Sequence, residues 1–145
     1  MAHKAIDIAK KILAKASTPD SGELVSNLKL QKMLYYQQGF HLAVFNKPLF
    51  DDEIEAWMYG PAIPCVYDHY KRHGNSGIKY NGEILALSPE QESLFNEVFD
   101  VYGDYSAIGL MNMTHREAPW KTTPTGKGNV ISHEKMKRFF KTRLK

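Results

Sequence analysis

The sequence predicts a mainly α-helical protein: a single compact domain over residues 1–145, with about six helices and one to three short β-strands. Three observations support this fold class. Apolar residues recur at the three- and four-residue spacing of helices along most of the chain. Serines stand directly before several of these segments, where their side chains can cap a helix. The alternation of apolar and polar residues that is typical of a strand is limited to one short stretch.

The first third of the chain predicts two helices joined by a loop. The first helix covers residues 6–16, in which isoleucine, alanine and leucine recur at helical spacing between lysines. Residues 17–22 read Ser-Thr-Pro-Asp-Ser-Gly, and this concentration of turn-forming residues predicts a loop. Ser26 or Asn27 then caps a longer helix that ends near Phe45.

Short strands and one further helix are predicted in the middle of the chain. Residues 53–59 alternate between the two faces of a strand. Residues 60–64, Gly-Pro-Ala-Ile-Pro, are expected to interrupt regular structure, and Pro64 is expected to open a third helix that stops at residues 73–75. An Asn-Gly pair lies between short apolar flanks within residues 78–87 and predicts a β-hairpin there.

Three more helices are predicted in the C-terminal half. Residues 88–91, Ser-Pro-Glu-Gln, form a capping box with proline at the first helical position, and the helix that follows ends at Gly103. Ser106 caps the next helix. Residues 116–129 contain two prolines and two glycines and are expected to be irregular. Ser132 then caps a final amphipathic helix.

Composition limits the classes of protein that fit. The single cysteine, Cys65, cannot form an internal disulfide, and the N-terminus lacks the basic start, apolar run and small-residue site of a signal peptide. Charged and amide residues interrupt every apolar stretch well before the ~20 residues that a membrane-spanning helix needs. We therefore expect a protein of the reducing cytoplasm with no membrane partner.

Residues that can carry catalysis or bind a metal do not form a complete site in the sequence. His69 and His73 have the spacing of two metal ligands on one helix face, but no third ligand follows at a recognisable spacing. Residues 114–117, Thr-His-Arg-Glu, offer hydrolytic side chains, yet triad members normally converge from separate segments. Cys65 is expected to be a small buried apolar residue. We predict no enzymatic activity, catalytic residue, metal site or cofactor.

Aromatic residues and a rigid proline near predicted loops are candidates for binding a protein partner. The proposed patch consists of Tyr59, Pro61, Tyr67 and Trp120. Large aromatic side chains beside irregular backbone are frequent in protein-binding hot spots. The alternative is that most of these residues belong to the hydrophobic core.

Positive charge is concentrated at the C-terminus, although the net charge is only +3. From His133 to Lys145 there are six lysines or arginines and one acid. Three interpretations are open: the solvated face of an amphipathic helix, a surface for an acidic protein partner, or a surface for nucleic-acid phosphates. A nucleic-acid-binding regulator that uses this basic helix is therefore the alternative function.

Four separated motifs resemble a known family. They are residues 30–36, Leu-Gln-Lys-Met-Leu-Tyr-Tyr, followed by Gly39; Leu49-Phe50 with residues 55–61, Glu-Ala-Trp-Met-Tyr-Gly-Pro; Val66-Tyr67; and Thr114-His115 with Pro119-Trp120-Lys121. In this order and spacing they resemble the Panacea domain, a phage-associated family that includes the SocA-like antitoxins. Met33 and Ala62 depart from the family pattern, and we interpret both as packing adjustments.

The resemblance implies a function and a set of partners. Panacea proteins are antitoxins of type II toxin–antitoxin systems, so the chain is expected to neutralise a cognate protein toxin encoded in the adjacent gene. It would do so by direct contact or, as in the SocA-like case, as an adaptor that delivers the toxin to a protease. The resemblance implies no catalysis. Nucleic acid is a minor candidate because the sequence has no helix-turn-helix signature and no stacking aromatic residues on the basic face of the last helix, and a homo-oligomer is left open. The shared residues are expected to be mostly scaffold.

Overall fold

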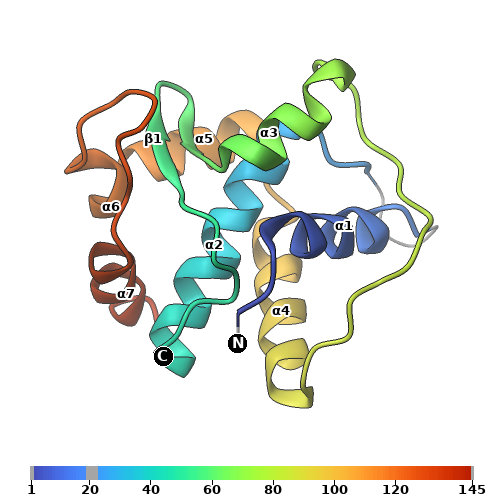
Figure 1. Cartoon of the computed structure of the whole chain (residues 1–145), viewed down its shortest axis with the longest axis horizontal. Coiled ribbons are helices and arrows are strands. Elements are labelled where there is room, and N and C mark those ends of the chain that lie inside the picture. The colour runs from blue at the N-terminus through green and yellow to red at the C-terminus, as the bar shows by residue number, and fades with distance from the viewer. Residues whose placement is uncertain (1, 19–22, 145) are drawn as a thin grey trace.

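The computed structural model describes residues 2–18 and 23–144 and shows a mainly α-helical chain with one small β-sheet (Figure 1), which confirms the predicted fold class. Within this part, the elements are α1 (Ala5–Ala16), α2 (Asn27–Phe45), β1 (Glu55–Trp57), β2 (Gly60–Ala62), α3 (Pro64–Tyr70), the 3-10 helix η1 (Lys71–His73), α4 (Pro89–Tyr102), α5 (Ala107–His115), α6 (Ala118–Lys121) and α7 (His133–Lys141). Of the loop predicted over 17–22, residues 19–22 lie outside the described residues.

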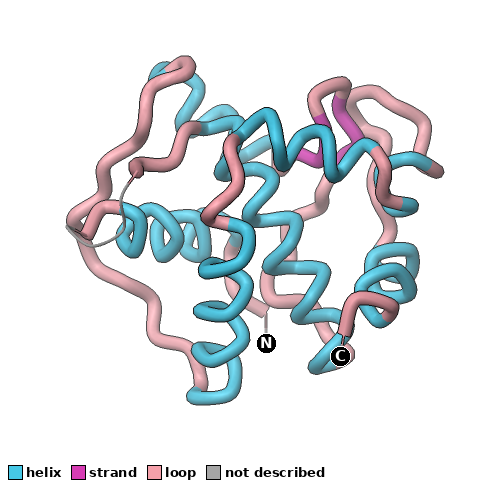
Figure 2. The backbone as a smooth tube through the Cα atoms, turned by 180° about the vertical axis from the view of Figure 1, so that it is seen from behind, coloured by secondary structure: helices cyan, strands magenta, loops and turns pink. Residues whose placement is uncertain are grey.

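Helix α2 is the centre of the fold and contacts α1, α3, α4, α5, α7 and β2. Figure 1 and, from behind, Figure 2 show it running through the middle of the molecule with the other helices around it. Most of its residues are buried, and Tyr35 and Tyr36 have no exposed surface. Because the helix lacks an outer polar face, its polar side chains need hydrogen-bond partners inside the protein.

The buried glutamines of α2 hold neighbouring segments in place. Gln31 Oε1 accepts a hydrogen bond from the Ile63 backbone N–H at 2.9 Å, directly after β2. Gln38 Oε1 accepts from the Leu49 N–H at 2.7 Å, and its Nε2 donates to the Phe50 carbonyl at 2.8 Å. These bonds satisfy buried amides that would otherwise lose water without compensation, and they fix both ends of the hairpin region against α2.

Local capping signals locate four helix starts. The side-chain oxygens of four serines accept hydrogen bonds from backbone N–H groups three residues later: Ser26 from Lys29, Ser88 from Gln91, Ser106 from Gly109, and Ser132 from Lys135. Gln91 Oε1 also accepts from the Ser88 N–H, which completes the predicted capping box. All four predicted caps are confirmed.

The β-hairpin predicted over residues 78–87 is wrong. Ile78 forms only an isolated bridge with Val25, and the rest of the segment contains no strand. The Tyr80 hydroxyl donates to the Glu83 carbonyl at 2.7 Å and closes a turn without flanking strands. An Asn-Gly pair favours a turn locally, but a hairpin also needs two flanks that pair with each other, and here they do not.

The strand predicted over 53–59 is present as β1, but the expectation that residues 60–64 interrupt regular structure is wrong. β2 pairs antiparallel with β1, with Ala56 opposite Pro61. Proline is tolerated here because an edge strand does not need every N–H for pairing. Gly60 has a φ of 106°, a left-handed conformation that favours glycine, and it opens β2.

The segment over 116–129, predicted to be irregular, contains the short helix α6. Pro119 sits in its first turn, where a backbone N–H would have no partner within the helix. The chain then returns to β1 and forms backbone hydrogen bonds beside it. The Ala56 N–H donates to the Asn129 carbonyl at 2.9 Å, and the Ile131 N–H donates to the Ile54 carbonyl at 2.8 Å. This return ties the start of α7 to the hairpin.

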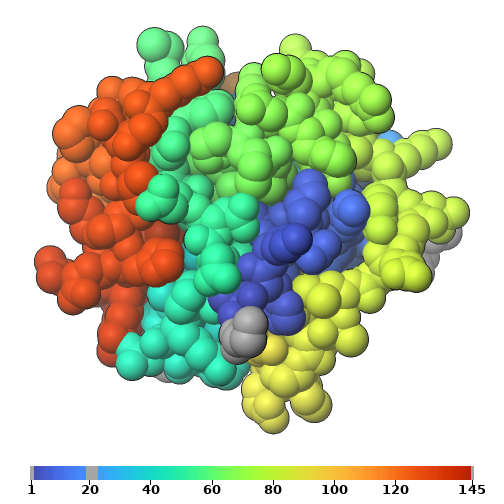
Figure 3. Space-filling model, viewed as in Figure 1, coloured from blue at the N-terminus to red at the C-terminus, as the bar shows by residue number. Residues whose placement is uncertain are grey.

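Helix α1 is held between the segment before β1 and the chain that leads into α4. Figure 3 shows this placement, with α1 in blue between green and yellow segments. The Ala5 N–H donates to Asp52 Oδ1 at 2.7 Å, and Lys11 Nζ donates to the Leu85 carbonyl at 2.7 Å. The apolar face of α1 is fully buried in the common core. The helical scaffold is thus continuous around α2.

Candidate functional site

A cavity of about 410 Å³ opens between the N-terminal half of α2, the β1–β2 hairpin, α3 with η1, and α5. Figure 1 shows these elements gathered at one end of α2. We call it the hairpin pocket. It is lined by Asn27, Leu28, Gln31, Lys32, Trp57, Tyr59, Gly60, Ala62, Tyr67, Lys71, Gly74, Asn75, Ile108 and Met111. Its size falls in the range of ordinary ligand and anchor pockets.

The rim of the hairpin pocket exposes large apolar side chains. Tyr59 is 63% exposed, Ile108 55% and Tyr67 37%. Trp57 packs against Tyr67 with ring centroids 5.1 Å apart, edge to face, and its Nε1 donates to Glu55 Oε1 at 2.9 Å. Edge-to-face packing and an anchored indole keep these rings in place. The rim thus combines a packed pair of rings, Trp57 and Tyr67, with apolar side chains that are open to solvent.

The floor of the pocket contains Lys32, which is only 2% exposed. Its Nζ donates to the Pro61 carbonyl at 3.1 Å. Burial lowers the pKa of Lys32 to about 7. A Cβ added at Gly60 would lie 2.7 Å from Lys32 Cε and 2.9 Å from Thr114 Oγ1, so only glycine lets β2 pass this close to the lysine. The hairpin and Lys32 are therefore fitted to each other.

The four residues predicted as a binding patch occupy three different positions. Tyr59 and Tyr67 line the pocket, whereas the Pro61 ring is buried and contributes its carbonyl to Lys32. Trp120 is half-buried outside the pocket lining: its Nε1 donates to the Trp57 carbonyl at 2.7 Å. The structure thus brings Tyr59 and Tyr67 together and uses Trp120 as a support behind the hairpin. Sequence reasoning did not single out Lys32 as a site residue.

Trp120 stacks on His115, with ring centroids 4.1 Å apart. His115 Nε2 is buried and has no hydrogen-bond partner among the described residues. Burial is the main cause that lowers the pKa of His115, and the nearby Lys32 lowers it further. A hydrogen bond with the Met58 backbone opposes this shift of the pKa, but the net direction favours the neutral imidazole, which packs against the indole as an uncharged ring.

The hydroxyl, imidazole and carboxylate of residues 114–117 do not converge. Glu117 is buried and accepts hydrogen bonds from the Tyr35 and Tyr36 hydroxyls, both at 2.9 Å. Thr114 Oγ1 donates to the Met111 carbonyl in its own helix at 2.8 Å. Burial raises the pKa of Glu117 and, more strongly, of both tyrosines. These side chains cross-link α2 to the α5–α6 junction.

The expectation that Cys65 is buried is wrong, because its side chain is exposed. Pro64 takes the first position of α3, which places Cys65 at the second position on the outer side of this short helix. The thiol donates to Asp52 Oδ2 at 3.0 Å, and the partial desolvation of this mostly exposed side chain, together with the carboxylate, raises the pKa of Cys65 to about 11. The residue is therefore a neutral thiol, not a reactive thiolate.

The two histidines with metal-ligand spacing lie on either side of an aromatic ring. The His69 and Tyr70 ring centroids are 4.6 Å apart, and those of Tyr70 and His73 are 6.1 Å apart. In residues 2–18 and 23–144, no three histidine, cysteine, aspartate or glutamate side chains gather into a group that could hold a metal ion.

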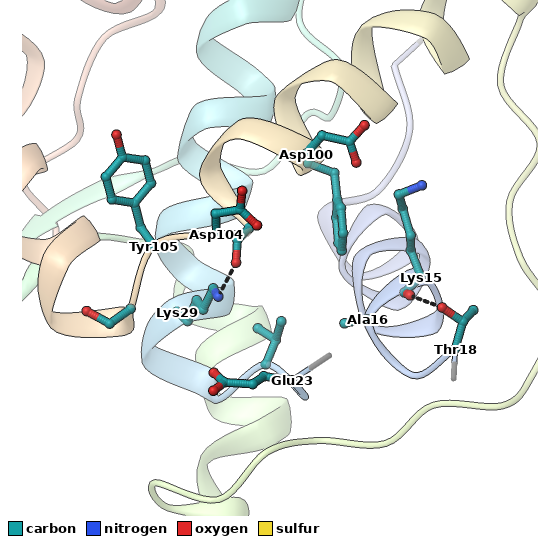
Figure 4. A pocket seen from close by; sticks show the side chains of 12 residues that line it. Lys15, Ala16, Thr18, Glu23, Lys29, Asp100, Asp104 and Tyr105 are labelled. Carbon is teal, nitrogen blue, oxygen red and sulfur yellow. Dashed lines mark hydrogen bonds between the residues drawn. The ribbon is translucent and has the colours of Figure 1, made fainter. Parts of the chain in front are cut away.

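A second cavity, of about 780 Å³, lies beside the ends of α1 and α4 and the start of α2. Figure 4 shows charged side chains of both signs around it. Lys29 Nζ donates to the Gly103 carbonyl at 2.6 Å, and burial lowers the pKa of Lys29 while Glu23 and Asp104 oppose this shift. Of the two lysines that line this cavity, Lys29 faces acids of the same chain and Lys15 Nζ lies 5.2 Å from the centre of the Phe99 ring, so this cavity offers less to a partner than the hairpin pocket does.

Part of the basic C-terminal set has a structural role. Lys135 Nζ donates to the Thr122 carbonyl at 2.8 Å and to Thr123 Oγ1 at 3.2 Å. The Arg143 guanidinium lies 4.5 Å from the centre of the Phe139 ring. Lys145 lies outside the described residues. These contacts favour the interpretation of α7 as an amphipathic helix with a solvated basic face.

None of the helices in the described part of the chain combines the length and the apolar character that crossing a membrane requires.

Comparison with known proteins places these features in a family. The family described as "Antitoxin SocA-like, Panacea domain" matches residues 30–121, which include Lys32, the hairpin, α3, α5 and α6. Antitoxin SocA of Caulobacter vibrioides is 32% identical over 137 residues, covering 86% of this chain and 72% of that protein. No solved structure matches. The chain therefore belongs to the family of SocA-like antitoxins with a Panacea domain.

Proposed function

We propose that this chain is the antitoxin of a type II toxin–antitoxin pair, and that it neutralises the protein toxin encoded in the adjacent gene by binding it at the hairpin pocket. The observation that carries the proposal is the pocket itself: an aromatic rim, open to solvent, within the region that matches the antitoxin family. Aromatic residues around a pocket are typical anchors of protein interfaces.

The supporting structure behind the rim favours binding without rearrangement. Gln31 holds the chain after β2, Lys32 holds the Pro61 carbonyl, and Trp120 holds the Trp57 carbonyl. A surface that is already ordered loses little conformational entropy when a partner docks. The described residues contain no convergent nucleophile, base and acid, so binding, not catalysis, is the activity that we propose.

The same contact can act in two ways. The antitoxin can cover the toxin's active surface, or it can present the bound toxin to a protease as an adaptor. Both require the toxin interface, and they differ in whether the toxin survives. We place this activity in the reducing cytoplasm, where the exposed Cys65 thiol stays unpaired.

Co-expression tests the proposal. The chain is produced in a bacterial host together with the adjacent gene, growth is scored, and complex formation is measured by co-purification. We expect growth rescue by the wild type and loss of rescue by the double substitution Tyr59→Ala and Tyr67→Ala, which removes both exposed rings. Val101→Ala, at an equally exposed apolar residue on α4, is the matched control and should rescue.

Each outcome has a distinct meaning. Rescue with a stable complex supports blocking, and rescue with protease-dependent disappearance of the toxin supports the adaptor mode. Growth rescue by the Tyr59→Ala and Tyr67→Ala double variant would show that the toxin interface lies outside the hairpin pocket. Absence of both rescue and complex would overturn the proposal, and DNA binding that weakens steeply with salt would then favour the nucleic-acid alternative.

A further inference from the structure

The charge lining the hairpin pocket is one-sided. Among the described residues, its lining includes two lysines, Lys32 and Lys71, and no aspartate or glutamate. Lys71 is exposed and lies 3.9 Å from Asp68. Lys32 is buried, and in the part of the chain that the structure describes its Nζ has a single hydrogen-bond acceptor, the Pro61 carbonyl. An ammonium group has three donors, so Lys32 has donors to spare.

The other polar side chains in this wall of the pocket are already paired. Asn27 Nδ2 donates to the Tyr67 carbonyl at 3.1 Å, and Gln31 Nε2 donates to Asn27 Oδ1 at 2.9 Å. Gln31 Oε1 accepts from the Ile63 N–H. Lys32 differs from these neutral amides because, among the described residues that line the pocket, it is the buried side chain that can carry a positive charge.

Two other lysines, Lys11 and Lys29, are also buried, but both lie near carboxylates. Lys11 forms an ion pair with Glu92 at 2.6 Å, and the charges of Glu23 and Asp104 oppose the lowering of the Lys29 pKa by burial. Burial is the sole cause that lowers the pKa of Lys32. A buried lysine without a nearby carboxylate costs stability, and such a cost is common where a residue serves binding.

We propose that the hairpin pocket receives an acidic side chain of the toxin, a glutamate or aspartate whose carboxylate pairs with Lys32 Nζ while its stem lies between the rings of the rim. This inference rests on the proposed function and adds the chemistry of the partner. A carboxylate fits because one buried cation is available and the walls are mainly aromatic and aliphatic. A phosphate group would need several converging donors, which the paired amides do not supply.

A small-molecule probe tests the pocket without the toxin. Hydrocinnamate carries one carboxylate on an aromatic stem, and hydrocinnamamide is its neutral counterpart. Both are titrated into the full chain at pH 7, and the Trp57 indole and Tyr67 signals are followed by NMR. We expect saturable shifts with the acid and binding at least about tenfold weaker with the amide.

Variants assign the effect to one amine. Lys32→Met keeps an unbranched side chain of similar volume and removes the ammonium group, and it should weaken acid binding to the level of the amide. Lys29→Met is the matched control, because Lys29 is buried on the same helix but faces the other cavity, and it should bind the acid like the wild type. Equal binding of acid and amide to the wild type, or absence of saturable shifts, would overturn the proposal.

Co-expression with the toxin separates this inference from the proposed function. Lys32→Met, once circular dichroism shows that it is folded, should lose growth rescue and co-purification, and Lys29→Met should keep both. If the wild type and Lys32→Met rescue equally, the antitoxin function stands and the carboxylate anchor is refuted. If the wild type itself does not rescue, the proposed function fails, and with it the toxin as the source of the carboxylate.

Discussion

Replacing Lys32 with methionine is expected to stabilise the isolated protein, by an amount that falls as the pH rises. Folding takes this amine into a site where its pKa is about 7, against an ordinary value of 10.5. At 1.36 kcal/mol per pH unit, this difference corresponds to about 5 kcal/mol of folding free energy at low pH. Methionine has no charge to desolvate and fills a similar volume, so the variant avoids this cost. Loss of the hydrogen bond to the Pro61 carbonyl offsets about 1–3 kcal/mol of the gain, which leaves a net stabilisation at pH 6.

The sign of the pH dependence follows from proton binding. Between pH 7 and 10.5 the unfolded chain holds the Lys32 proton and the folded chain releases it, so wild-type stability rises with pH across this window. Below pH 7 both states are protonated and the full cost remains. The advantage of Lys32→Met should therefore shrink by about 3 kcal/mol from pH 6 to pH 9.

Urea unfolding followed by circular dichroism at pH 6, 7, 8 and 9 measures this difference. Lys71→Met is the control, because the Lys71 ammonium is exposed at the pocket rim. The free energy of unfolding of this variant, plotted against pH, should run parallel to that of the wild type. A Lys32→Met variant that is less stable than the wild type at pH 6 would refute the reasoning. Parallel wild-type and Lys32→Met curves from pH 6 to pH 9 would show that Lys32 is hydrated or paired with an acid.

Substitutions at three further positions test the scaffold around α2. Gly39→Ala places a Cβ 2.1 Å from the Phe140 ring, so we expect the free energy of unfolding to fall by about 1–3 kcal/mol and the thermal midpoint to drop. An unchanged midpoint would mean that α7 packs less closely on α2 than the structure shows. Glu117→Ala leaves two buried tyrosine hydroxyls without their acceptor and should cost about 2–4 kcal/mol in urea unfolding, whereas Glu117→Gln, which keeps one acceptor oxygen, should cost less. Ser88→Ala removes the N-cap of α4 and should cost about 1 kcal/mol, with hydrogen exchange rising first at the start of that helix; uniform exchange would argue against a local cap.

The elements that were predicted correctly depend on short-range chemistry. Ser88 and Gln91 satisfy each other's backbone amides within a single turn, so the start of α4 is encoded in four residues. The caps at Ser26, Ser106 and Ser132 are equally local, because each serine oxygen accepts a hydrogen bond from the backbone N–H three residues later. The wrong hairpin shows the limit of this logic, because a turn can form locally while strand pairing depends on what the flanking residues meet elsewhere.

The sequence by itself determined the helical fold class, most helix boundaries and two of the aromatic residues, Tyr59 and Tyr67, that line the pocket. Only the tertiary structure decided that Lys32 is buried without a carboxylate, because its surroundings come from β2, α3 and α5, which are distant in sequence. Likewise, Glu117 meets Tyr35 across 82 positions. Helix periodicity and caps are set by neighbours along the chain, whereas burial and charge pairing are set by neighbours in space, and these determine the chemistry of the pocket.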